Sequence, residues 1–174
     1  MMNKIRAFLI LSGYQLTWLA CVFGEITYSI PYLGILIGVC YLILFFYFVI
    51  NKIRFLLIAI LISLPGYFFD TLMVHYKVYT FNTTFILGTL PFWMIVLWLS
   101  FATLFDEILL IFKKYKVLGI LLSGILGPVT YYLGQPIGVL TINNLLLFFI
   151  FSILFWSILM FLLLNIILNK LNLV

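Results

Sequence analysis

The stretch Leu145–Leu168, LLLFFIFSILFWSILMFLLLNIIL, decides the class of this protein. It carries no charged residue, and it is longer than the roughly 20 apolar residues that a helix needs to cross the hydrocarbon core of a bilayer. Asn169 and Lys170 follow it directly. We therefore expect a transmembrane helix here.

Five further apolar runs precede this helix, at residues 5–23, 31–50, 55–74, 85–105 and 117–133. Each run is continuous, whereas the strands of a transmembrane barrel would alternate in polarity over shorter segments. Pro65-Gly66, Pro91 and Gly127-Pro128 lie inside the third, fourth and fifth runs, where they predict kinks. The sequence thus predicts an all-α integral membrane protein, a single domain over residues 1–174 that forms a compact bundle of six transmembrane helices. Five spans is the main alternative, if the Gly-rich fifth run is re-entrant.

The composition excludes a soluble domain. Hydrophobic residues make up 67% of the chain and charged residues 7%, whereas a soluble domain has about 25% charged residues. The mean hydropathy is +1.37. The formal net charge of +5 comes from residues at the expected helix ends and not from a basic stripe, so we expect no nucleic-acid partner.

The basic residues also predict the orientation of the chain. When the six runs are laid across a membrane in order, eight of the nine Lys and Arg residues fall on one side and only Lys77 falls on the other. The eight are Lys4, Arg6, Lys52, Arg54, Lys113, Lys114, Lys116 and Lys170. Because short basic loops stay on the cytoplasmic side, we expect a multi-pass protein of the bacterial inner membrane with both termini in the cytoplasm.

Few residues could hold a metal or a cofactor. Cys21 and Cys40 both lie in expected spans and are predicted to be small apolar fillers, not a disulfide. His75 is the single histidine. The sequence therefore predicts no metal site and no cofactor.

Asp70 is the strongest candidate for a functional side chain, because it lies within the third expected helix, about one turn from the outer end of that helix. Ionisable groups in spans usually face the bundle interior and mark a site, although Asp70 would also serve as a snorkelling cap of its helix. Several polar and aromatic residues are expected in the same outer half and form a candidate polar cavity. They are Gln15, Trp18, Glu25, Asp70, His75, Trp93, Trp98, Tyr131 and Tyr132.

Two helix faces admit a simpler interpretation as packing surfaces. Trp18, Cys21 and Glu25 follow Tyr14 at helical spacing, which also fits a packing seam. In the fifth run Gly119, Ser123 and Gly127 recur every four residues, so that another backbone can approach closely. This second face suits either an internal contact or a homo-oligomer.

One pattern runs along most of the chain. It combines the segments Tyr14–Trp18, Asp70 with Leu72 and Phe81, Pro91–Trp93 through Trp98 to Ala102, Gly127-Pro128 with Tyr131–Gly134, and Gly138-Val139. This pattern resembles that of a small bacterial inner-membrane family labelled domain of unknown function 2878. Gln135-Pro136 departs from the family's pattern. The family has no assigned activity, and relatives lie beside genes for cyclopropane-fatty-acid-type lipid modification, so the resemblance implies a lipid-linked context.

Three functions remain open at this stage. The first is a lipid- or small-amphiphile-binding carrier or an accessory component of an envelope lipid pathway. The second is a membrane-embedded enzyme that modifies a lipid or isoprenoid with Asp70 as acid/base, assisted by Tyr131 or His75. The sequence favours the first, because it shows no nucleophile with a recognisable base and no paired-carboxylate motif. The third is a structural or assembly subunit.

Overall fold

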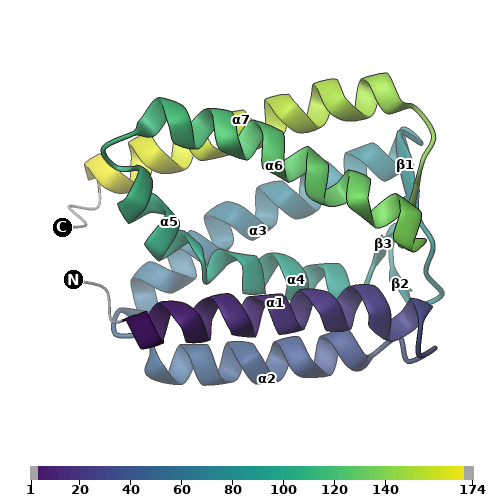
Figure 1. Cartoon of the computed structure of the whole chain (residues 1–174), viewed down its shortest axis with the longest axis horizontal. Helices are drawn as coiled ribbons and strands as arrows, with labels where there is room; N and C mark the ends of the chain where they lie inside the picture. Colours follow the sequence, from purple (N-terminus) through teal and green to yellow (C-terminus); the bar gives the residue numbers. More distant parts are fainter. Residues whose placement is uncertain (1–3, 171–174) are drawn as a thin grey trace. The chain divides into compact units, whose positions relative to one another are not determined.

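The computed structural model describes residues 4–170 and all their side chains except those of residues 4–7, 106, 107, 110 and 166–170. The chain ends, for which we predict a cytoplasmic location, lie outside these residues. The elements shown in Figure 1 are α1 Lys4–Ile26, α2 Leu33–Phe48, α3 Lys52–His75, β1 Tyr79–Phe81, β2 Ile86–Leu87, β3 Leu90–Pro91, α4 Trp93–Ala102, α5 Phe105–Phe112, α6 Lys116–Ile137, β4 Leu140–Ile142 and α7 Leu145–Lys170.

The chain folds as two compact units. Unit 1 comprises Met1–Thr71 and Thr83–Asp106, and unit 2 comprises Leu72–Asn82 and Glu107–Val174. Helix α3 is shared by both, since the boundary falls near its end.

In unit 1, α1 and α2 lie side by side as a helical hairpin, and α4 packs against both (Figure 1). A β-carbon at Gly34 of α2 would lie 2.5 Å from Cα of Cys21 on α1, so the close approach of the two helices requires glycine there. The Tyr41 hydroxyl donates to the carbonyl of Ile10 at 3.1 Å and shares a 2.7 Å hydrogen bond with the hydroxyl of Thr103. These contacts join α2 to α1 and to the residue that follows α4.

In unit 2, α6 and α7 form a second helical hairpin. The strands β1 and β4 pair antiparallel, with Tyr79 opposite Ile142 and Phe81 opposite Leu140. The Asn82 side chain donates to the carbonyl of Gly138 at 3.1 Å, which ties the end of β1 to the end of α6. The segment that follows α3 and the segment that leads into α7 are therefore joined at one end of the unit.

Among the residues that the structure describes, four helices are long and apolar enough to cross a membrane. They cover Phe8–Ile26, Lys52–His75, Lys116–Ile137 and Leu145–Asn165, while Leu33–Phe48 and Trp93–Ala102 are apolar but shorter. The predicted helical class is thus confirmed. The six-span topology stays a prediction, because α2 and α4 fall short of the length of a full span.

The expected fourth helix, 85–105, is the main correction. Helix begins only at Trp93, and residues 86–91 form an antiparallel hairpin in which Ile86 pairs with Pro91. Gly88 at the turn has φ +66°, a left-handed conformation that would interrupt a helix. Pro91 therefore precedes α4 and does not lie inside it.

The other boundaries differ by smaller amounts. The second helix begins at Leu33, two residues after the expected start at Pro31. The fifth extends to Ile137, past the expected end at residue 133, because Gly138 with φ +89° caps it and donates its N–H to the carbonyls of Gln135 and Gly134. Pro65 lies inside α3 as expected, and Pro128 and Pro136 lie inside α6. The predicted kinks at these prolines stay predictions.

Candidate functional site

Asp70 is fully buried in unit 1 and is hydrogen-bonded to an indole. The Nε1–H of Trp98 on α4 donates to Oδ2 of Asp70 on α3 at 2.7 Å. Asp70 is 0% exposed and Trp98 is 4% exposed. A hydrogen bond to a carboxylate is stronger than one between neutral groups, and more so where water is excluded.

Gly66, one turn before Asp70, makes room for the same indole. A β-carbon at Gly66 would lie 2.5–2.6 Å from three ring atoms of Trp98. The ring therefore lies directly against the backbone of α3, and its edge reaches Asp70. We refer to Gly66, Asp70 and Trp98 as the indole–carboxylate site.

Two buried hydroxyl groups lie on the helices that make this site. The Oγ atoms of Ser63 on α3 and of Ser100 on α4 have no hydrogen-bond partner among the residues described. Ser63 shares the helix face of Gly66 and Asp70, being three and seven residues before them. Ser100 lies two residues after Trp98 and so faces another side of α4. A buried hydroxyl that makes no hydrogen bond is costly, so Ser63 offers a polar contact on the face of Asp70.

Glu25, near the end of α1, binds the chain that leads to β2. Its carboxylate accepts a hydrogen bond from the Thr83 hydroxyl, from the backbone N–H of Thr84 at 2.6 Å and from the Thr84 hydroxyl at 2.9 Å. The side chain of Trp93 is a further donor. Glu25 therefore acts in this structure as an anchor for residues 83–84.

The carboxylates of Glu25 and Asp70 engage different indoles of α4. Glu25 is bound by Trp93, and Asp70 is bound by Trp98. These tryptophans are five residues apart, which corresponds to roughly 7.5 Å along a helix and about 140° around it. Helix α4 thus presents one indole N–H to a carboxylate of α1 and another to a carboxylate of α3.

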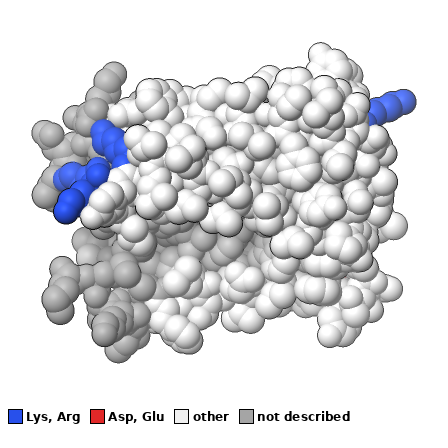
Figure 2. All heavy atoms as spheres, turned by 45° about the horizontal axis from the view of Figure 1, so that its top comes forward, with Lys and Arg blue, Asp and Glu red and all other residues white. Residues whose placement is uncertain are grey.

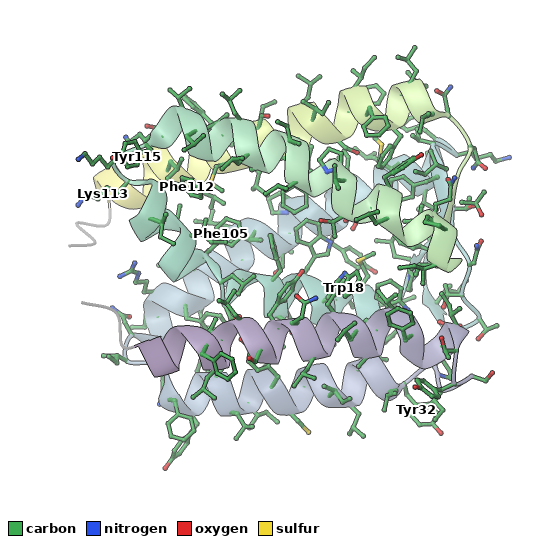
Figure 3. The ribbon with its side chains drawn as sticks, in the orientation of Figure 1. Trp18, Tyr32, Phe105, Phe112, Lys113 and Tyr115 are labelled. Carbon is green, nitrogen blue, oxygen red and sulfur yellow. The ribbon has the colours of Figure 1, made fainter. Side chains whose placement is uncertain are left out.

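The remaining candidates on α1 differ in exposure. Gln15 is exposed and Trp18, marked in Figure 3, is half-buried. Tyr14 packs against Phe101 with ring centroids 5.6 Å apart, and Cys21 is buried. Tyr14 and Cys21 thus make packing contacts, in agreement with the simpler interpretation of that face, whereas Gln15 is not enclosed.

His75, Tyr131 and Tyr132 belong to unit 2. His75 is exposed and stacks edge-on against Tyr76, with ring centroids 5.2 Å apart. Tyr131 packs against the buried Tyr79 at 5.8 Å, and Tyr132 packs against Phe149 at 5.8 Å. The two tyrosines thus contact different rings, and Phe148 links these rings because it packs against both Tyr79 and Phe149.

The small residues of α6 are used inside unit 2. A β-carbon at Gly127 would collide with the indole of Trp156 on α7, and the Ser123 hydroxyl donates to the carbonyl of Trp156 at 3.1 Å. Gly119 faces Phe112, which lies at the turn from α5 to α6 (Figure 3). A homo-oligomer through α6 stays a prediction, and it would have to use the rest of the helix surface.

In the part of the chain that the structure describes, no three His, Cys, Asp or Glu residues come together as a metal site. Cys21 is buried, Cys40 is exposed, and both thiols are free.

Sequence reasoning found Asp70 and Trp98 but not their contact, and it missed Thr83 and Thr84 as partners of Glu25. The pairs are 28, 58 and 59 residues apart. The helix face that Gly66 shares with Asp70 was the one available signal for an indole packed beside the carboxylate.

A family model matches most of the chain. The model of a family described as "Protein of unknown function (DUF2878)" matches residues 8–162. No curated protein and no solved structure matches the chain.

Proposed function

We propose that this chain, which belongs to the DUF2878 family of proteins of unknown function, is a polytopic inner-membrane protein that binds a lipid or small amphiphile at the indole–carboxylate site. The observation that carries the proposal is the complete burial of the Asp70 carboxylate in an apolar helical unit. Ionisable groups within spans are costly and are commonly retained for function. A binding role explains why the chain has Asp70 at this position and not an apolar residue. The protein would act as a carrier or as an accessory component of an envelope lipid pathway.

The chemistry of the site favours a particular kind of ligand group. A carboxylate accepts hydrogen bonds, and the Trp98 indole, which can only donate, is bonded to one of its oxygens. A ligand that reaches Asp70 would therefore present a hydroxyl or amino group. The hydroxyl of Ser63 on the same helix face offers a second polar contact. An amphiphile with a small donor head group and an apolar tail, such as a glycerolipid or an isoprenoid alcohol, fits this combination.

Charge supports the predicted orientation. In unit 2, Lys113 and Lys114 precede α6, and Lys116 Nζ contacts Asn165 of α7 at 3.2 Å. The carbonyl of Lys77 accepts a hydrogen bond from Asn143, just before α7, so Lys77 lies at the opposite end of this helical hairpin. On the face seen in Figure 2, blue Lys and Arg side chains lie near two opposite edges, and the described side chains drawn between them are uncharged. By the positive-inside rule we assign the Lys113–Lys116 end to the cytoplasm.

The enzyme alternative stays a prediction with less support. General acid/base chemistry on a lipid commonly uses two groups that converge. Glu25, the other acidic residue considered, holds Thr83 and Thr84. The structural-subunit alternative would use a surface of the protein and would require no ligand.

Native mass spectrometry of the full chain released from mild detergent tests the proposal. We expect a bound lipid or isoprenoid on the wild-type protein. Asp70→Asn should reduce its occupancy about tenfold, which corresponds to the loss of one hydrogen bond to a charged group. Glu25→Gln is the matched control, because it also removes a carboxylate but leaves the indole–carboxylate site intact.

Trp98→Phe guards against a folding defect in Asp70→Asn. It keeps an aromatic ring beside Gly66 but removes the indole N–H together with part of the bicyclic ring, so we expect it to alter the occupancy of the ligand while Asp70 keeps its carboxylate. The melting temperature of each variant, measured alongside, shows that the protein is folded. A wild-type protein without any adduct across lipid compositions would contradict the proposal. Equal occupancy in wild type and a folded Asp70→Asn would also overturn it.

A further inference from the structure

Helix α4 is too short to cross a bilayer, and the chain enters it in an unusual way. It has 10 residues, or about 15 Å of helix. The residues before it, from Phe85 to Phe92, form the β2–β3 hairpin instead of the first turns of a span. The position of this hairpin along the neighbouring α3 decides what surrounds it.

The tip of the hairpin lies beside the middle of α3 and not beside the C-terminal end of that helix. The Tyr67 hydroxyl on α3 donates to the carbonyl of Leu87, at the tip of the hairpin, at 3.4 Å. Tyr67 lies eight residues before His75, where α3 ends, and that spacing corresponds to about 12 Å along the helix axis. Side chains lean toward the N-terminus of their helix, which places the hydroxyl no closer to the end than its own Cα. The tip therefore lies beside α3 about two helical turns before that helix ends.

Several backbone N–H and C=O groups of the hairpin have hydrogen-bond partners within the protein, as non-helical backbone at such a depth requires. The N–H of Phe92 donates to the carbonyl of Phe85 at 3.0 Å, and the carbonyl of Leu87 accepts from Tyr67. Pro91, in β3, has no N–H to satisfy. Glu25 fixes the base through Thr83 and Thr84.

The two strands of the hairpin face different surroundings. Leu90 and Pro91 of β3 are buried, whereas Ile86 and Leu87 of β2 are 57% and 46% exposed. Phe68 and Leu64, beside Tyr67 on α3, are also exposed. Residues 78–105 contain no charged side chain. An exposed, uncharged strand beside exposed apolar positions of a membrane-length helix continues the same apolar surface.

We propose that residues 85–92 form a re-entrant hairpin whose outer strand, with Phe85, Ile86 and Leu87, contacts lipid acyl chains inside the bilayer. The proposal rests on the membrane placement in the proposed function but not on any ligand at Asp70. The fourth expected span would then consist of this hairpin and the short helix α4. The exposed apolar side chains of the hairpin then have lipid as their partner.

Collision accessibility of a nitroxide on the full chain in phospholipid vesicles tests the depth of the tip. Leu87→Cys, in a Cys40→Ser background, carries the label. Lys77→Cys in the same background is the aqueous reference. Native Cys40, exposed on α2, is the lipid reference, while Cys21 is buried. We expect the label at position 87 to collide with oxygen much more than with a water-soluble nickel chelate, by a ratio several-fold above that at position 77 and close to that at Cys40.

Ile86→Cys repeats the measurement if Leu87→Cys does not fold. A ratio at position 86 or 87 equal to that at position 77 would overturn the re-entrant hairpin, because the tip would then lie in water. The nitroxide on Cys40 shows whether only the re-entrant hairpin is wrong or whether the membrane placement of the protein is wrong as well. If position 40 also favours the nickel chelate, α2 is not in lipid and both proposals fail.

Discussion

Gly66→Ala should destabilise unit 1 by moving the Trp98 indole away from Asp70. The new β-carbon would lie 2.5–2.6 Å from Cε2, Cδ2 and Cε3 of the indole. No rotation within a rigid bicyclic ring relieves a contact with its face, so the indole or the helix must shift. The expected result is strain together with a weakened Trp98–Asp70 hydrogen bond.

The magnitude follows from these two effects. Overpacking a tight contact costs about 1–3 kcal/mol, and a hydrogen bond between membrane helices contributes roughly 0.6–1.7 kcal/mol. Alanine also gains about 1 kcal/mol over glycine in helix propensity. Gly124→Ala is the matched control, because it has the same propensity gain and its one close contact is the Ser157 hydroxyl at 2.4 Å, which can rotate away, while the atoms of Ile153 lie at 3.6 and 3.7 Å. We expect the free energy of unfolding of Gly66→Ala to be lower than that of Gly124→Ala by about 2–4 kcal/mol.

Titration of each variant from mild detergent into a denaturing detergent, followed by circular dichroism, gives the two free energies. Equal values for Gly66→Ala and Gly124→Ala would refute the reasoning. A double-mutant cycle adds a second criterion. If Gly66→Ala acts through the indole, its effect should shrink in a Trp98→Phe background, and strictly additive effects would show that it acts elsewhere.

Three further predictions concern other parts of the chain. Glu25→Gln should weaken the anchoring of residues 83–84, so amide hydrogen exchange at Thr84 should speed up relative to wild type, and unchanged exchange would exclude the anchor role. Gly127→Leu should force α6 away from the Trp156 indole of α7. We expect it to lower the free energy of unfolding by about 1–3 kcal/mol in the same titration. A variant as stable as wild type would contradict that packing. In cells, Lys77→Cys should react with a membrane-impermeant thiol reagent applied outside while Lys113→Cys should not, and the reverse pattern would invert the proposed orientation.

The candidate site was only partly predictable. Asp70 stood out because a carboxylate in an apolar run is rare, which is a local property of the sequence. Its hydrogen-bond partner could not be recognised from the sequence, because any of several donors on other helices could have bound the carboxylate. Trp98 binds it because α4 lies against Gly66, and this arrangement depends on the packing of residues 32 positions apart.

The expected fourth helix shows where local patterns mislead. Residues 85–105 are as apolar as a span, and hydropathy does not distinguish a hairpin followed by a short helix from one long helix. Gly88 and Pro91 were the available signals, but a proline inside an apolar run also fits a kinked helix. The hydroxyl of Tyr67 and the carboxylate of Glu25, which hold the hairpin and its base, are distant in sequence.

The sequence by itself determined the helical class and the placement of basic residues at the ends of the apolar runs, and four of the six runs it offered as spans are long helices in the described residues. These follow from the sequence because a helix satisfies its backbone hydrogen bonds within its own segment, so its length and hydropathy are local properties. The tertiary structure alone decided that Trp98 binds Asp70, that Glu25 holds Thr83 and Thr84, and that Gly127 meets Trp156 on α7. These contacts join segments far apart in the chain, and they exist because packing brings one particular donor or ring close enough to touch.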